Sequence, residues 1–201
     1  MVRLLILVFL LPSVAAAEEW PALHAVTGVA ADDVLNVRNA PSAGGEIIGT
    51  LDPFQTGVEV MRTDDTGRWG VIISGEQAGW VAMRFLEAMP GGFLPEYGSL
   101  SCGGTEPFWR LEVTEGATAE FAGPEQSWGV SAGSWIPASG MRWPYAMKGE
   151  GDGRTMTAVI TPEICSDGMS DREYGLSVTL VSQDSSETQV YSGCCTLGVG
   201  Q

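Results

Sequence analysis

The sequence predicts an all-β protein made of two small units, and three observations support this fold class. The 27 glycines and 11 prolines interrupt the chain so often that long helices are nearly excluded. From Val26 onward the apolar residues come in short β-branched or aromatic runs separated by Gly, Asp, Ser and Pro, which is typical of many short strands. Residues 89–98 are rich in Pro and Gly, and we interpret them as a linker between a first domain at 22–88 and a second at 99–201.

The residues before the first domain have the layout of a secretory signal peptide over positions 1–17. Arg3 precedes an apolar run at 4–11, and small residues follow at 15–17. A membrane-spanning helix needs roughly 20 apolar residues, so this run is too short to be a permanent anchor. We therefore expect cleavage after Ala17, a periplasmic or secreted location, and no membrane anchor in the mature chain.

Acidic residues dominate the charge of the chain. There are 25 Asp and Glu against 10 Lys and Arg, and the net charge is −15. Binding to nucleic acid requires clustered basic residues, and the sequence has no run of them. We expect no nucleic-acid partner and a soluble monomer, although an acidic surface could also favour cationic partners.

The first domain has the strand pattern of a small barrel. The predicted strands include residues 34–37, 47–51, 58–61, 69–73 and 78–81. The last two flank a loop at 74–77 that contains Gly75, the pattern of a β-hairpin. Six short strands within about 65 residues leave little room for another architecture.

These residues resemble the bacterial SH3 (SH3b) family. The resemblance is carried by residues 35–42 (LNVRNAPS), by Trp69 and by residues 79–81 (GWV), and it covers positions 24–87. It implies a small barrel that commonly binds cell-wall peptides or other peptides and that is usually attached to another functional domain.

The same resemblance implies where a ligand would bind. The groove is expected near Asn36, Arg38 and Asn39 on one side and Trp69 and Trp80 on the other. Tryptophan is a common anchor because it offers a large apolar area with one polar group. Two alternatives stay open: the tryptophans could fill the barrel core, and Arg38 could donate to turn carbonyls.

All four cysteines lie in the second domain, at Cys102, Cys165, Cys194 and Cys195. An exported chain passes through an oxidising compartment, so we expect disulfides. Neighbouring side chains on a strand point to opposite faces, and a bridge between adjacent residues is strained, so each of the last two cysteines needs a distant partner. We prefer the pairing Cys165–Cys194 and Cys102–Cys195, and the crossed pairing stays open.

The second domain is predicted to contain seven or eight antiparallel strands. Trp109, Leu111 and Val113 alternate with polar residues, and residues 176–180 repeat that pattern. Closure into a barrel would remove exposed edges. The full prediction is an SH3-like small barrel followed by a disulfide-bonded antiparallel β-barrel or sandwich. Most of the aromatic side chains between 108 and 145 are expected in its core.

Two motifs in the second domain are similar to an uncharacterised family of secreted or envelope proteins from proteobacteria. They are residues 104–109 (GTEPFW) and 165–172 (CSDGMSDR), with Gly193 and Cys194 near the end. The chain has Gly175 after Tyr174, where the family often has proline. The resemblance implies a discrete domain and supports the Cys165–Cys194 bridge, but it implies no activity.

No catalytic residue, metal site or cofactor is predicted. His24 is the one histidine and lies in the other domain from the cysteines, which disfavours Cys–His, Ser–His–Asp and zinc sites. The carboxylates of Glu106, Asp167 and Asp171 leave open a weak glycan-acting enzyme as a third hypothesis.

We therefore expect an exported, non-enzymatic binding or adaptor protein of the cell envelope. Its partner would be a cell-wall peptide, another peptide or an envelope protein, recognised by the SH3b module. The alternative is a secreted inhibitor or ligand-binding β-barrel in which the SH3b domain is only a spacer.

Overall fold

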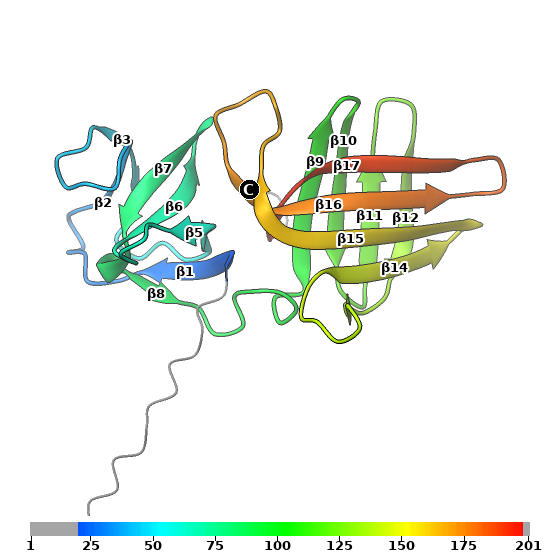
Figure 1. Ribbon diagram of the computed structural model, residues 1–201, viewed down its shortest axis with the longest axis horizontal. Helices are drawn as coiled ribbons and strands as arrows, with labels where there is room; N and C mark the ends of the chain where they lie inside the picture. The colour runs from blue at the N-terminus through cyan, green and yellow to red at the C-terminus, as the bar shows by residue number, and fades with distance from the viewer. Residues whose placement is uncertain (1–19, 199–201) are drawn as a thin grey trace, which may run out of the picture.

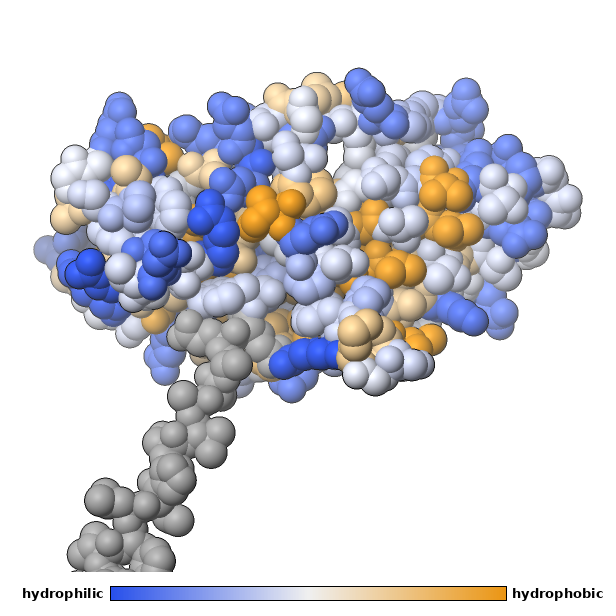
Figure 2. Space-filling model, viewed as in Figure 1, coloured by the Kyte–Doolittle hydropathy of each residue, from blue (hydrophilic) through white to orange (hydrophobic). Residues whose placement is uncertain are grey.

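A computed structural model describes residues 20–198, which form two β-rich units that lie side by side (Figure 1). The predicted signal peptide and its cleavage site lie outside the described residues. The fold class predicted from the sequence is confirmed. On the face shown in Figure 2, most strongly apolar residues lie over the second unit, and the first unit is largely hydrophilic.

The first unit is a small barrel made of two sheets. One sheet has the order β4-β1-β8 and the other the order β3-β2-β7-β6-β5. Their strands are β1 (Ala22–Val26), β2 (Leu35–Arg38), β3 (Ile47–Leu51), β4 (Val58–Val60), β5 (Arg62–Thr63), β6 (Trp69–Ser74), β7 (Gln77–Ala82) and β8 (Leu86–Ala88). A short 3-10 helix, η1 (Met83–Phe85), joins β7 to β8.

Side-chain alternation sets the inner and outer faces of this barrel. In β2, Leu35 and Val37 are buried in the apolar core, while Asn36 and Arg38 are only partly buried. A strand turns successive side chains to opposite faces, so the polar pair lies on the outer face. The core thereby fixes the position of two predicted ligand-binding residues.

The second unit is a closed antiparallel barrel of eight strands. Its strands are β9 (Ser99–Thr105), β10 (Phe108–Thr114), β11 (Thr118–Ala122), β12 (Ser127–Ala132), β14 (Tyr145–Gly151), β15 (Arg154–Cys165), β16 (Tyr174–Gln183) and β17 (Thr188–Leu197). They follow the order β12-β11-β10-β9-β17-β16-β15-β14, and pairing between β12 and β14 closes the circle. A two-residue strand, β13 (Ile136–Pro137), lies beside β14.

The interior of the second barrel is a packed apolar core. Trp109, Trp135 and Tyr145 are buried in it, and Trp128 packs against it. Phe108 is the exception among the aromatic residues of this stretch, because 62% of its surface is exposed. The expectation that most of these aromatic side chains belong to the core is confirmed.

Two motif glycines make room for the indole of Trp109. A Cβ atom at Gly104 would overlap with Nε1 of Trp109, and one at Gly193 would overlap with the carbonyl oxygen of Gly103. Both positions therefore need glycine, which has no side chain: the indole of Trp109 lies against the backbone at Gly104, and both the backbone of β9 and the indole lie against it at Gly193. Packing therefore explains why glycine stands at position 104, in the GTEPFW motif, and at position 193.

The two disulfides lie on opposite sides of β17. Cys102 bonds Cys195 inside the barrel, where both residues are buried and face each other across β9 and β17. Cys165, at the end of β15, bonds Cys194. This is the pairing that the sequence analysis preferred, and the alternation of Cys194 and Cys195 along the strand is its physical basis.

The segment between the two barrels packs more than its composition suggests. Leu94 is 1% exposed and belongs to the core of the second barrel, together with Leu23 from β1. The amide of Leu23 also donates to the carbonyl of Gly92 at 2.7 Å, and the amide of Met89 donates to the carbonyl of Leu23 at 2.9 Å. Leu94 lies within the Pro/Gly-rich segment 89–98 that the sequence analysis interpreted as a linker, so this segment packs against the second barrel as well as joining the two units. The domain boundaries themselves stay a prediction.

A loop of the second barrel also bonds the hairpin of the first. The loop between β15 and β16 reaches the start of β7, beside the β6–β7 turn (Figure 1), where Ala78 donates its amide to the carbonyl of Asp171 at 2.9 Å. The amide of Asp171 donates to the carbonyl of Glu76 at 3.0 Å, and Arg172 pairs with the Glu76 carboxylate at 2.6 Å. The two units therefore share backbone and side-chain bonds.

One buried carboxylate lies at this junction. Glu59 of β4 is 9% exposed, and its Oε2 accepts a hydrogen bond from the amide of Leu197 in β17 at 3.2 Å. Its Oε1 is buried without a hydrogen-bond partner. Burial raises the pKa of Glu59 to about 8, against a smaller lowering by the Leu197 amide.

Candidate ligand groove

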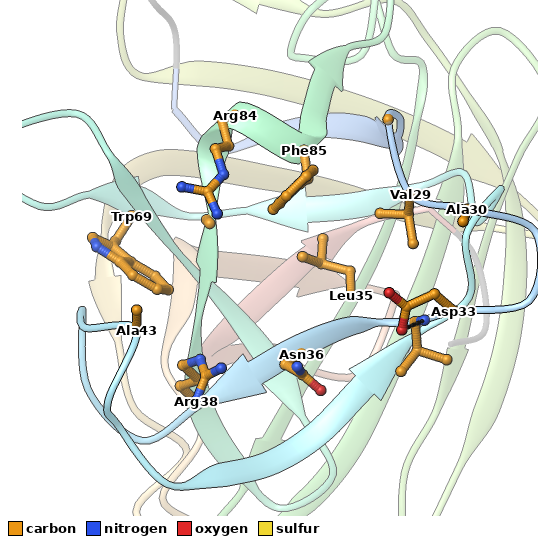
Figure 3. A pocket seen from close by; sticks show the side chains of 13 residues that line it. Val29, Ala30, Asp33, Leu35, Asn36, Arg38, Ala43, Trp69, Arg84 and Phe85 are labelled. Atoms are coloured by element: carbon orange, nitrogen blue, oxygen red, sulfur yellow. Dashed lines mark hydrogen bonds between the residues drawn. The ribbon is translucent and has the colours of Figure 1, made fainter.

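The outer face of the first barrel carries a hollow of about 470 Å³. In Figure 3, Trp69 and Arg38 lie on one side of it, and Arg84 and Phe85 of η1 lie along its upper edge. Leu35 lies in the middle of the view, and Asp33 lies at the end away from Trp69. An aromatic ring, an apolar floor and separated charges are the usual elements of a site that orients a small polar ligand.

A second hollow of about 550 Å³ continues the first. The two share Ala43, Trp69, Ala82 and Arg84 in their walls, so Trp69 stands between them. The second hollow adds Arg68. Together they form one open channel across the first barrel, which we call the Trp69 groove.

A tight turn holds Trp69 in position. The carboxylate of Asp64 accepts hydrogen bonds from the amides of Arg68 and Trp69 at 2.8 and 2.9 Å, and the hydroxyl of Thr66 donates to it at 2.6 Å. The hydrogen bonds from Thr66 and from Trp69 lower the pKa of Asp64. Gly67 takes a positive φ of 66° in this turn, which favours glycine.

The structure brings three of the five predicted ligand-binding residues into this groove. They are Asn36, Arg38 and Trp69. Asn39 does not line it; its Nδ2 donates to the Glu46 carboxylate at 3.3 Å, and its Oδ1 accepts from the Glu46 amide at 3.0 Å. Arg38 lines the groove and also donates from Nη1 to the carbonyl of Gly45 at 2.6 Å, so the turn-bonding alternative and the ligand-binding role are compatible.

Trp80 lies apart from the groove. The guanidinium of Arg62 lies 5.1 Å from its ring centre, and the same guanidinium bonds the carboxylate of Glu173 in the second unit at 2.9 Å. Trp80 does not line either hollow. Its surroundings are those of the junction between the two units.

Sequence reasoning missed three residues of the groove. Arg68 immediately precedes Trp69, and Arg84 and Phe85 lie in η1, the short helix that follows β7. Nothing in their spacing identifies them, because η1 brings Arg84 and Phe85 next to β2 only in the folded barrel. An arginine beside an aromatic residue at the end of a strand is the one local signal that could have raised them as candidates.

The predicted carboxylate site of the second unit has a structural explanation at Asp167. Its Oδ1 accepts the amides of Met169 and Ser170 at 3.0 and 2.9 Å, and its Oδ2 accepts the hydroxyls of Ser170 and Tyr174 at 2.8 and 3.3 Å. Burial opposes ionisation, but these bonds outweigh it and lower the pKa of Asp167 to about 2. A carboxylate held in this way shapes the loop and is poorly suited to act as a general acid.

Within residues 20–198, no group of three or more His, Cys, Asp or Glu side chains is placed to hold a metal ion. No cysteine is free there, and His24 bonds the carbonyl of Ala22 through Nδ1 at 3.0 Å. The same range contains no helix that is long and apolar enough to cross a membrane.

A small β-barrel with an open groove on its outer face defines a binding module. Residues 33–87 match the family model of the bacterial SH3 domain, which agrees with the resemblance carried by the LNVRNAPS and GWV segments. The match lies within the first unit and leaves the second barrel outside it. No curated protein and no solved structure matches the chain.

Proposed function

We propose that this chain is an exported, non-enzymatic binding protein of the cell envelope whose Trp69 groove holds a cell-wall peptide. The second barrel would act as a disulfide-bonded partner domain that the SH3 module places beside the wall. Two disulfides agree with folding in an oxidising compartment, as do the signal-like residues 1–17.

The observation that carries this proposal is the Trp69 groove itself. Trp69 stands between two open hollows, with a guanidinium, an amide side chain and an apolar floor within the same channel. Tryptophan in such a position can stack on the backbone or side chains of an extended peptide, and polar groups beside it can fix the peptide's direction.

The non-enzymatic part of the proposal rests on the state of the reactive side chains. The four cysteines are disulfide-bonded, and the carboxylate of Asp167 is occupied by four hydrogen bonds. His24 is buried in the first barrel. These groups therefore offer no nucleophile with an adjacent base.

Cosedimentation of the full mature chain with purified sacculi tests the proposal. The wild type is expected to sediment with sacculi, and Trp69→Ala is expected to bind about thirtyfold more weakly, because a central aromatic anchor contributes about 2 kcal/mol or more. Phe54→Ala is the matched control, because Phe54 belongs to the first unit, is 70% exposed and does not line the groove.

Thermal unfolding of each variant shows whether a loss of binding reflects a loss of folding. Binding that is unchanged in folded Trp69→Ala would reject the Trp69 groove as the site. Failure of the folded wild type to bind sacculi would reject the wall-binding role.

A further inference from the structure

The Trp69 groove is a cationic site on a strongly acidic protein. Arg38, Arg68 and Arg84 line its walls, whereas the chain as a whole has only 10 basic residues against 25 acidic ones. The acidic residue that lines the groove is Asp33, and Figure 3 places it at the end away from Trp69. Positive charge therefore gathers around Trp69, where the two hollows meet.

These three arginines differ from others among residues 20–198 because none of them lies within ion-pair distance of a carboxylate there. Arg62, Arg154 and Arg172 each lie within 2.9 Å of an Asp or Glu oxygen. Among residues 20–198, Arg38, Arg68 and Arg84 form no ion pair with a carboxylate. In a chain with 25 acidic residues, a group of unpaired guanidiniums facing one channel points to an anionic ligand.

The guanidinium groups also keep most of their hydrogen-bond donors. Arg38 donates from Nη1 to Gly45, and Arg68 donates from Nε to the Thr66 hydroxyl at 3.1 Å. Arg84 stacks over the ring of Phe85 at 4.6 Å. A guanidinium has five N–H donors in a planar fork that matches the two oxygens of a carboxylate.

We propose that the Trp69 groove selects wall peptides with free carboxylate groups, which its arginines bind while the peptide packs on Trp69. This inference rests on the proposed function and specifies the ligand of that same site. A carboxylate fits better than a phosphodiester polymer, since the net charge of −15 repels a long polyanion, whereas a short peptide brings one or two charges to one local site. Asp33 at the far end would direct the carboxylates toward Trp69.

The test compares two synthetic stem peptides of the cell wall, one with free carboxylates and one with the same carboxylates amidated. Their affinities for the full mature chain are measured by calorimetry for the wild type, Arg38→Gln, Arg84→Gln and Arg110→Gln. Arg110 is the charge-matched control, because it lies on the second barrel with 69% of its side chain exposed and outside the groove. Thermal unfolding confirms that each variant is folded.

The wild type is expected to prefer the free peptide by up to about fivefold for each ion pair that a peptide carboxylate forms with an arginine. Arg38→Gln and Arg84→Gln should each reduce this preference, and Arg110→Gln should retain it. Equal binding of the two peptides would overturn the carboxylate inference and leave the wall-binding role standing. If neither peptide nor sacculi bind the folded wild type, the proposed function fails together with the inference.

Discussion

Glu59→Gln should remove a large part of the pH dependence of stability near neutrality. Glu59 is buried at the junction between the two units, and its pKa is raised from an ordinary value of 4.5 to about 8. At about 1.36 kcal/mol per pKa unit, this rise corresponds to about 5 kcal/mol between the fully protonated and fully ionised limits. The figure is an upper bound, because opening of the junction would let water reach the carboxylate at a smaller cost.

The direction in which stability changes with pH follows from which state of the protein, folded or unfolded, holds the Glu59 proton more tightly. The folded state keeps the Glu59 proton up to about pH 8, whereas the unfolded chain releases it near pH 4.5. The stabilisation is therefore complete below pH 4.5 and is lost as the pH rises through 8. The lowered pKa values of Asp167 and Asp184, each about 2, place their titration below this window.

Urea unfolding of wild type and Glu59→Gln between pH 4.5 and 9 measures the effect. Glutamine keeps the shape of the protonated acid, so the difference between the two free energies of unfolding isolates the titration of Glu59. We expect this difference to change by several kcal/mol in favour of the variant as the pH rises. A difference that stays flat over the whole range would refute the reasoning. After correction for the intrinsic rise of amide exchange with pH, the protection of the Leu197 amide from hydrogen exchange should fall at alkaline pH in the wild type alone.

Three further predictions concern the framework. Replacing Cys102 and Cys195 by alanine should lower the free energy of unfolding by about 4.6 kcal/mol, because the bridge restricts the unfolded chain over a separation of 93 residues. Urea unfolding without reductant measures the loss, and a loss below about 1 kcal/mol would contradict the prediction. Gly193→Ala should cost about 1–3 kcal/mol in the same assay because its Cβ overlaps backbone, and a neutral result would show that β17 can shift. Trp80→Ala should speed chymotryptic cleavage after Phe93 or Tyr97 by loosening the junction, and unchanged cleavage kinetics would assign Trp80 no part in it.

Local sequence patterns were sufficient for the architecture because strand alternation and turn chemistry act over a few residues. The alternating Trp109, Leu111 and Val113 predicted a half-buried strand, and β10 has that pattern. Adjacent Cys194 and Cys195 implied two bridges on opposite faces of one strand, and the structure has them there.

The groove and the junction were harder to predict because they depend on contacts between distant segments. Asn36, Arg38 and Trp69 carry a recognisable motif, but Arg84 reaches them only through the turn of η1. The sequence shows no run of basic residues, yet three arginines from separate segments gather in one channel. Leu94 was similarly hidden, since a few apolar residues in a Pro/Gly-rich segment give no sign that a neighbouring barrel will bury one of them.

The two disulfides that converge on β17 also determine how the protein responds to proteolysis. Any single cut between Cys102 and Cys195 leaves the two fragments covalently joined by that bridge, so a nicked second barrel stays in one piece until it meets a reductant. The segment 89–98 precedes both bridges and has no such protection. A cut there breaks the covalent link between the groove-bearing module and the barrel, so that only the noncovalent contacts at the junction then hold the two units together.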